Sequence, residues 1–373
     1  MSEEFSGIPP IADRLDWNAV IDHALEKAAS FILRPNGDYA EAIYGCGSNQ
    51  AGKLVPNGKN LLSESELTVQ AIVDALPTRF GLIYVKPADY IFNLQFTSPE
   101  KTAVLVENKI LTLYGEGYCL ANELKGGAMF QLANGANCRL IHSIPTGGNN
   151  TNSINLFGMQ FDGNRTYQTE THPLIYVDGA GIRIRDSYIS RCVFRNATGQ
   201  PLYLKNPIDT WIHNNAFEDS SDGVRLEFIN YYVHFYDNYL HGLGGEYGLY
   251  LRGVGGTGLC FIHDNSIGNW KYGIGIYNLN KSKVHDNIIF GAGNQAHNTW
   301  DAMRIWGSLT QELNVHDNTF ISGLANKPKY DIHLVSDCDY VWVRNNICKS
   351  WVTEAIKVEA GVNPNGVVEL NVT

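Results

Sequence analysis

Short segments with alternating apolar and polar positions recur along residues 174–359. In each five-residue segment the second and fourth positions are apolar, and the other three positions are mixed. The segments are LIYVD from Leu174, PLYLK from Pro201, GVRLE from Gly223, GLYLR from Gly248, GIGIY from Gly273, AMRIW from Ala302, DIHLV from Asp331 and AIKVE from Ala355. Alternation with a period of two predicts a strand that buries one face.

An asparagine recurs between these segments. It has an apolar residue three positions before it and another two positions after it. The asparagines are Asn215, Asn238, Asn265, Asn287, Asn318 and Asn346, and Cys192 and Met159 take the same place in two earlier repeats. Asparagine tolerates a left-handed backbone, and stacked amide side chains can hydrogen-bond to one another. The column therefore predicts a tight bend whose asparagines stack at one corner of the fold.

The two columns together define a repeat of 22–31 residues. One such unit cannot bury its apolar positions alone, but units stacked with parallel strands about 4.8 Å apart can. A leucine-rich repeat would show LxxLxL periods and a propeller would need about 40 residues per blade. Neither period is present, so the sequence predicts an all-β solenoid of parallel strands.

The residues also carry a family resemblance. The chain resembles the right-handed parallel β-helix proteins of the pectate lyase-like (pectin lyase-like) superfamily over roughly residues 65–373. ELTVQAIVDALPTRFGLIYVKPADYIFN at 66–93 is similar to their N-terminal helix and first strand, with Ala88 and Asp89 in place of the glycine-bearing PxGxY turn expected over 87–90. ILTLYGEG at 110–117 resembles a first full coil. The resemblance implies a right-handed parallel β-helix over 66–373.

Residues 1–65 are expected to form a small mixed α/β cap or appendage before the β-helix. The pattern of residues 16–29 predicts an amphipathic helix, and Pro35-Asn36-Gly37 predicts the turn of a hairpin over 30–45. A second hairpin is expected at Asn57-Gly58. Some cap is physically required, since an open coil end exposes strand edges and core.

Charge and hydropathy limit the kinds of partner and the location expected for the chain. With 28 Lys+Arg against 38 Asp+Glu, the net charge is −10, which argues against nucleic acid and anionic membranes as partners. No stretch of about 18 apolar residues is present to span a bilayer. The acidic start MSEEFSGIPP is unlike a signal peptide. The resemblance implies an extracellular or surface location if the chain is processed, and a cytoplasmic location is expected otherwise; a homo-oligomer stays open.

The sequence gives little indication of disulfide bonds or of a metal site. The seven cysteines are irregularly spaced without a CxxC pair, so we expect reduced core residues rather than disulfides or a zinc site. The His-Asp pairs beside the repeated asparagines suggest Ca²⁺ less strongly than polar bend chemistry. No cofactor and no metal site are predicted.

The outward positions of the alternating segments form a candidate ligand strip. The resemblance implies a groove along this first strand of each coil. Aromatic rings and arginine forks there would suit an acidic polysaccharide. The residues predicted to bind substrate are Tyr203, Lys205, Tyr250, Gly275, Tyr277, Trp306 and Lys357.

Three chemistries are compatible with the strip. A lyase needs a base and a cation for the uronate carboxylate, a hydrolase needs two carboxylates, and a binding or spike protein needs neither. The predicted catalytic residues are Arg225, Glu227, Arg252, Asp301, Arg304 and His333. We expect an enzyme, with a lyase acting on an acidic, uronate-containing polysaccharide ahead of a glycoside hydrolase and of a non-catalytic carbohydrate-binding protein.

Gly275 marks the expected centre of the site. It removes one side chain from the outward ladder, and the long loop 290–301 follows that coil. Arg304 and His333 are expected on adjacent strands about 4.8 Å apart. The guanidinium would favour a neutral imidazole, which could then act as a general base beside the notch.

Overall fold

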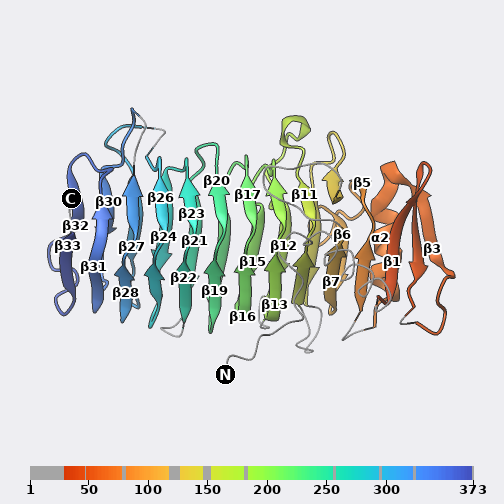
Figure 1. The fold of residues 1–373 in the computed structure, drawn as a ribbon, viewed down its shortest axis with the longest axis horizontal. Coiled ribbons are helices and arrows are strands. Elements are labelled where there is room, and N and C mark those ends of the chain that lie inside the picture. The colour runs from red at the N-terminus through yellow and green to blue at the C-terminus, as the bar shows by residue number, and fades with distance from the viewer. Residues whose placement is uncertain are drawn as a thin grey trace, which may run out of the picture.

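The chain forms a parallel β-helix that runs along the long axis of the molecule (Figure 1). The computed structural model describes residues 29–371, except 47, 78–80, 117–126, 146–152, 180–183, 255–257, 294–295 and 322–324. The helix predicted over 16–29 lies outside these residues, apart from its last position. The predicted all-β, right-handed parallel β-helix is confirmed.

The alternating segments form one parallel sheet, here called sheet B. Its strands lie in sequence order along the solenoid, so each coil adds one strand. They are β6 (Thr102–Glu107), β9 (Arg139–Ile144), β12 (Ile175–Asp178), β15 (Leu202–Lys205), β18 (Val224–Ile229), β21 (Tyr247–Gly253), β24 (Tyr272–Tyr277), β27 (Asp301–Trp306), β30 (Tyr330–Leu334) and β32 (Glu354–Val358).

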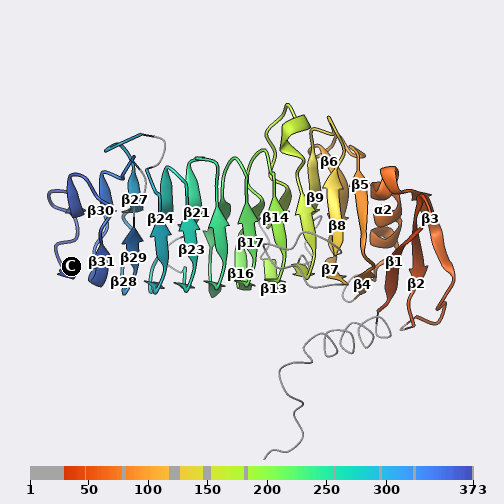
Figure 2. The same cartoon turned by 45° about the horizontal axis from the view of Figure 1, so that its top comes forward.

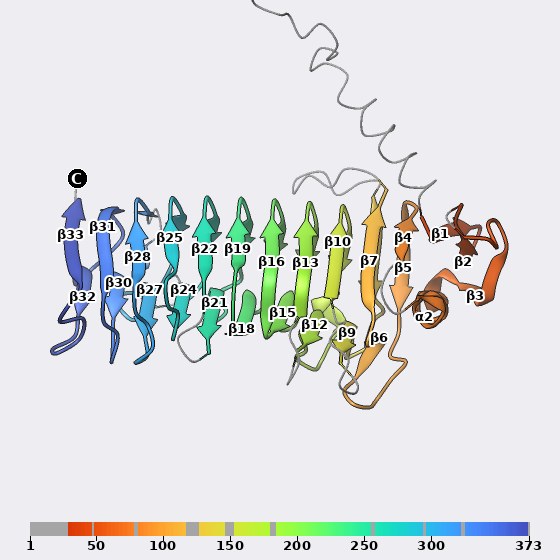
Figure 3. The same ribbon diagram turned by 90° about the horizontal axis from the view of Figure 1, so that it is seen from below.

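The other two strands of each coil belong to sheet A and are separated by the asparagine bend. The strands before the bend lie side by side in Figure 3. They are β7 (Ile110–Gly115), β10 (Ser153–Phe157), β13 (Ile184–Ser190), β16 (Pro207–His213), β19 (Val233–Tyr236), β22 (Cys260–His263), β25 (Lys283–His285) and β28 (Leu313–His316). Strand β31 (Val341–Cys348) spans the bend, and β33 (Val367–Asn371) pairs with it on both sides of the bend. Those after the bend are β5 (Ala88–Phe92), β8 (Ala128–Leu132), β11 (Gln160–Asp162), β14 (Val193–Arg195), β17 (Ala216–Glu218), β20 (Tyr239–His241), β23 (Ser266–Gly268), β26 (Ile288–Phe290) and β29 (Thr319–Ile321).

The inward positions of the coils form a continuous core. The second and fourth residues of most alternating segments are fully buried, and one apolar cluster runs from Phe31 to Ala355. Burial of this kind is the main favourable term that holds a solenoid together.

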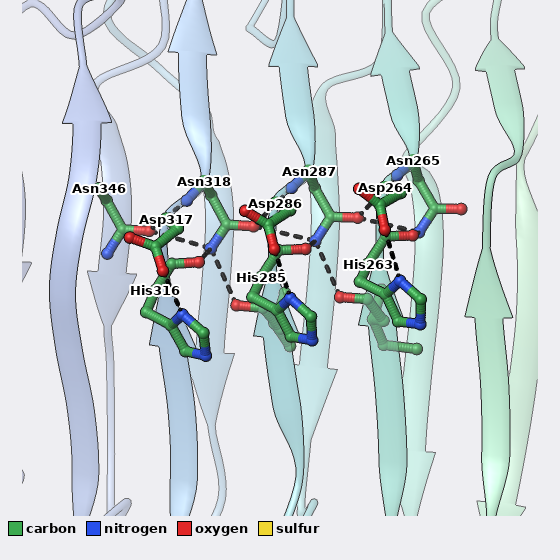
Figure 4. A network of polar contacts seen from close by, with 12 residues as sticks. His263, Asp264, Asn265, His285, Asp286, Asn287, His316, Asp317, Asn318 and Asn346 are labelled. Carbon is green, nitrogen blue, oxygen red and sulfur yellow. Dashed lines mark hydrogen bonds and ion pairs between the residues drawn. The ribbon is translucent and has the colours of Figure 1, made fainter. Parts of the chain in front are cut away.

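The repeated asparagines stack at one corner, as predicted. Each amide Nδ2 donates to the Oδ1 of the next asparagine, at 3.0 Å from Asn215 to Asn238 and 2.9 Å from Asn265 to Asn287. Figure 4 shows the row from Asn265 to Asn346. The left-handed residue is, however, the one before each asparagine, for example Asp264 with φ 55°. The expectation of a left-handed asparagine was therefore wrong: the amide is needed for its hydrogen bonds.

The N-terminal cap closes the first coil (Figure 2). Strands β1 (Phe31–Asn36) and β2 (Tyr39–Tyr44) form the predicted hairpin, and β1 also pairs in parallel with β4 (Leu82–Val85). A short helix η2 (Leu62–Glu64) and α2 (Ser65–Ala75) follow the third strand, β3 (Leu54–Leu61).

Two local expectations in the cap region were wrong. Asn57-Gly58 does not turn a hairpin, because β3 runs through it with Asn57 at φ 59°. The turn expected over 87–90 is shorter, since β5 already begins at Ala88. Short turn signals inside a strand mark an irregular backbone as readily as a chain reversal.

The cysteines and the helices add two observations. Five of the six described cysteines are buried and Cys46 is exposed, and none of the six is in a disulfide, which agrees with reduced core residues. Among the described residues, no helix is both long enough and apolar enough to cross a membrane.

A buried carboxyl group makes stability depend on pH. Burial of Asp331 raises its pKa from 3.8 to about 6, although Ser350 donates both its backbone N–H and its hydroxyl to the carboxyl group. A raised pKa contributes stability that is complete below pH 3.8 and is lost as pH rises through about 6. We expect the parent chain to lose about 3 kcal/mol relative to Asp331→Asn between pH 4 and pH 8. Melting temperatures of both proteins across this range measure the effect, and a constant difference would contradict it.

Candidate active site on sheet B

The outward ladder has the predicted order. Tyr203, Arg225, Tyr250, Gly275, Arg304, His333 and Lys357 are consecutive partners across sheet B. A parallel ladder joins Lys205, Glu227, Arg252, Tyr277 and Trp306. All the residues predicted from the sequence therefore lie on this sheet, and we call its outward side chains the strip.

At the N-terminal end of the strip, flat side chains stack on one another. Ring centroids are 4.9 Å apart between His142 and Tyr176 and 4.8 Å apart between Tyr176 and Tyr203. Arg225 continues the stack between Tyr203 and Tyr250, at 5.6 and 4.9 Å from their centroids. Burial, with Arg139 nearby, lowers the pKa of His142 to about 4. Because ring faces here cover each other, this end offers edges rather than faces to a ligand.

Most charges on this part of the strip are paired. Arg225 donates to Oε1 of Glu227 at 2.7 and 3.0 Å, and the hydroxyl of Tyr203 donates to Oε2. Burial alone would raise the pKa of Glu227, but these hydrogen bonds and the neighbouring arginines lower it. Lys205 lies 3.3 Å from Asp178, so it too has an anionic partner. These groups fix the surface and leave little free charge.

Gly275 does not leave an open notch. A Cβ at this position would lie 2.5 Å from the ring of Tyr247. Tyr247 stacks on Tyr272 at 4.8 Å and approaches Trp306 at 6.3 Å. The glycine is therefore needed because an aromatic ring lies across the strand, and the expectation of an empty subsite at Gly275 was wrong.

Arg304 lies beside this aromatic cluster. Its Nη1 donates to the hydroxyl of Tyr272 at 2.9 Å, and its guanidinium is 5.7 Å from the centroid of Trp306. No carboxylate of the described residues lies within ion-pair distance of it. Arg304 thus keeps a guanidinium that can accept an anionic ligand.

His333 lies between two carboxylates. Its Nδ1 is 2.9 Å from Asp301 and its Nε2 is 3.0 Å from Glu359. Asp301 is buried, whereas the side chain of Glu359 is 45% exposed. The hydrogen bond from His333 lowers the pKa of Glu359. The sequence predicted Arg304 as the charged neighbour of the His333 imidazole, whereas the ring contacts two carboxylates.

Three residues of this region were missed by the sequence argument. Tyr247 and Tyr272 each come one position before an alternating segment. Strict alternation would direct their side chains into the core. The chain bends there, so their rings lie over the strip instead. Glu359 is the last residue of the segment AIKVE, two positions after Lys357, the register partner of His333. The repeat places the two residues on neighbouring strands, but it does not indicate that their side chains are in contact.

The repeated histidines lie on sheet A and not near the strip. His263, His285 and His316 stack at 5.0 and 4.9 Å, and each Nδ1 contacts the next aspartate in the chain (Figure 4). Within the described parts of the chain, no group of three or more His, Cys, Asp or Glu side chains could hold a metal ion. Their regular stacking is a property of the repeat.

Comparison with known proteins gives one family and several distant structures. The model of the right handed beta helix region matches residues 147–348, more than half of the chain. DFA-IIIase from Arthrobacter chlorophenolicus, in complex with DFA-III, aligns at 14% identity over 83% of this chain and 76% of that chain, with a TM-score of 0.52.

A second solved structure is similar to the same extent in sequence. The A-module of a mannuronan C-5 epimerase from Azotobacter vinelandii aligns at 16% identity over 82% of this chain and 94% of that chain, with a TM-score of 0.45. At 14% identity the likeness to the DFA-IIIase structure concerns the fold alone. No curated protein matches the chain by sequence.

Proposed function

The chain belongs to the right-handed β-helix family, and from this premise we propose that it is a carbohydrate-active protein, a lyase that cleaves a uronate-containing polysaccharide on sheet B. The proposal rests on the positions of two neighbouring residues, Arg304 and His333. Arg304, which has no carboxylate partner among the described residues, is the direct register partner of His333, which is bound to Asp301. A free cation for the uronate carboxylate and an oriented imidazole thus lie on adjacent strands.

The elimination can be written with these residues. Arg304 binds the uronate carboxylate and stabilises the negative charge that develops as the adjacent carbon loses its proton. Asp301 accepts from Nδ1–H of His333. Nε2 of His333 faces the exposed Glu359 carboxylate, and it becomes the base once Glu359 takes the Nε2 proton and moves aside, so that the lone pair points outward. Nε2 takes the proton, the electron pair forms a C=C bond, and the glycosidic C–O bond breaks. The imidazolium then returns the proton to the departing oxygen.

Two carboxylates of the strip, Glu227 and Glu359, favour elimination over hydrolysis. A glycosidase needs a protonated carboxylic acid, which usually means a raised pKa. The pKa values of Glu227 and Glu359 are instead lowered by their hydrogen-bond partners. Asp331 has a raised pKa, but it is buried against Ser350 and does not reach the strip.

A panel of acidic polysaccharides tests the proposal. Each is incubated with the parent chain, and ultraviolet absorbance of the unsaturated product and reducing ends are measured separately. Both signals rising together is the expected result. Reducing ends alone would indicate a hydrolase, and binding without either signal would indicate a non-catalytic carbohydrate-binding protein.

Binding should weaken with salt. Arg252 and Arg304 are the guanidiniums of the strip without an ion pair among the described residues, and the Debye length is about 10 Å at 0.1 M salt. We expect affinity for a uronate oligosaccharide to fall about tenfold between low and high salt. Calorimetric titration measures this, with a neutral oligosaccharide as the control. An affinity independent of salt would contradict recognition through these two arginines.

A further inference from the structure

Phe228 has a backbone conformation that a bulky residue rarely adopts. It follows Glu227 at the end of β18, where the pairing with β21 is interrupted by a bulge between Glu227 and Ile229. Its φ is 57°, in the left-handed region that disfavours large side chains. Strain of this kind is often found where a side chain has a functional position.

The neighbouring coils show what the fold itself requires at this place. The residues that directly follow the outward ladder of the adjacent strands are Asn206, Gly253, Asn278 and Gly307. Three of them also have positive φ, at 67° for Asn206, 55° for Asn278 and 104° for Gly307. Asparagine and glycine satisfy this turn at little cost. The geometry of the turn therefore does not require a phenylalanine at position 228.

The ring of Phe228 lies on Arg252. The guanidinium is 4.7 Å from the centroid of Phe228 and 5.5 Å from that of Tyr277 on the following strand. The nearest carboxylate in register is Glu227, but its two oxygens already accept from Arg225 and Tyr203. Arg252 makes no hydrogen bond or ion pair with any residue that the structure describes. Arg252 is therefore a half-buried cation between two rings, without an ion pair among the residues that the structure describes.

We propose that Phe228, Arg252 and Tyr277 form an anion subsite that recognises a carboxylate or sulfate group on the polysaccharide. Two rings fix the planar guanidinium, so that less freedom is lost when its donors bind an oxyanion. The subsite rests on the proposed function and refines its substrate class. Arg252 lies two coils from Arg304, or about 10 Å along the stack at the usual strand spacing. The ligand therefore carries anionic groups on more than one sugar residue.

Calorimetric titration and thermal melting of matched variants test the subsite. The probes are an oligogalacturonate and an oligomannuronate for carboxylates, a carrageenan oligosaccharide for sulfates, and a neutral cello-oligosaccharide as the control. Phe228→Asn installs the residue that adjacent coils use. We expect it to weaken binding of the anionic probe three- to tenfold, which is about the range of one cation–π contact, while the melting temperature stays equal or rises.

Three further variants complete the design. Phe228→Tyr keeps the ring and should keep the affinity, and Arg252→Ala should lose at least as much affinity as Phe228→Asn. Asn278→Gly alters the same turn two strands beyond Phe228 and should leave the affinity unchanged. If the parent binds an anionic probe and both Phe228→Asn and Arg252→Ala keep its affinity, the subsite is refuted and the proposed function stands. A Phe228→Asn variant that melts lower but binds normally would also refute the subsite. No binding of any anionic probe by the parent would refute both.

Discussion

Replacing Asn265 by leucine is expected to destabilise the protein by about 3–5 kcal/mol. The Asn265 side chain is buried, and its Nδ2 donates to Phe235 O, His263 O and Asn287 Oδ1, each at 2.9 Å. Its Oδ1 accepts from the backbone N–H and the Nδ2 of Asn238, at 3.0 and 3.1 Å. Leucine has a similar volume but removes all five bonds, and it takes from the buried backbone N–H of Asn238 the acceptor that it has in the parent.

Chemical or thermal unfolding of the parent and the variant measures this loss. Asn314→Leu is the matched control, because Asn314 lies on the outer face of β28 and its Oδ1 has no hydrogen-bond partner among the described residues. The control should unfold with the parent. If Asn265→Leu also unfolds with the parent, the asparagine row does not stabilise the coil.

Replacing His333 by alanine is expected to lower turnover by about 10²–10⁴-fold, the usual contribution of a general base. Oδ2 of Asp301, 2.9 Å from Nδ1, orients the ring of His333. In the proposed mechanism Arg304, and not His333, binds the substrate carboxylate. The KM value should therefore change little for His333→Ala. Arg304→Ala should lose affinity as well as turnover, because it removes the group that binds the carboxylate.

Steady-state kinetics on the polysaccharide identified in the panel measure both effects. His316→Ala and Arg344→Ala are matched controls, since both residues lie on the strands of sheet A, away from the strip. Both controls should keep the activity of the parent. A His333→Ala variant with full turnover would place the catalytic base elsewhere.

The repeat made the architecture predictable. Each coil has the same pattern, with an apolar pair inside and an amide at the bend. A departure in one coil therefore does not hide the pattern, because the other coils keep it. The order of Tyr250, Gly275, Arg304 and His333 across the sheet followed from that register alone. Local backbone detail was less accessible, as the left-handed residue before each asparagine shows.

The site was only partly predictable because its chemistry depends on side-chain direction. Alternation assigns Tyr247 to the core, but the bend at the start of β21 turns its ring over Gly275. Charge counting treats every arginine alike, yet Arg225 is bound to Glu227 whereas Arg252 lies between two rings. These differences arise from contacts between coils, which spacing along the sequence does not contain.

A crystal structure of His333→Ala with a uronate oligosaccharide bound is the most direct test of the proposed site, because the slowed variant should retain its substrate. The account predicts that the sugar chain lies along sheet B, with one carboxylate accepting two hydrogen bonds from the guanidinium of Arg304 and the adjacent carbon facing the space left by the imidazole. An oligosaccharide bound on the outer face of sheet A, or one whose carboxylates avoid Arg304, would contradict it.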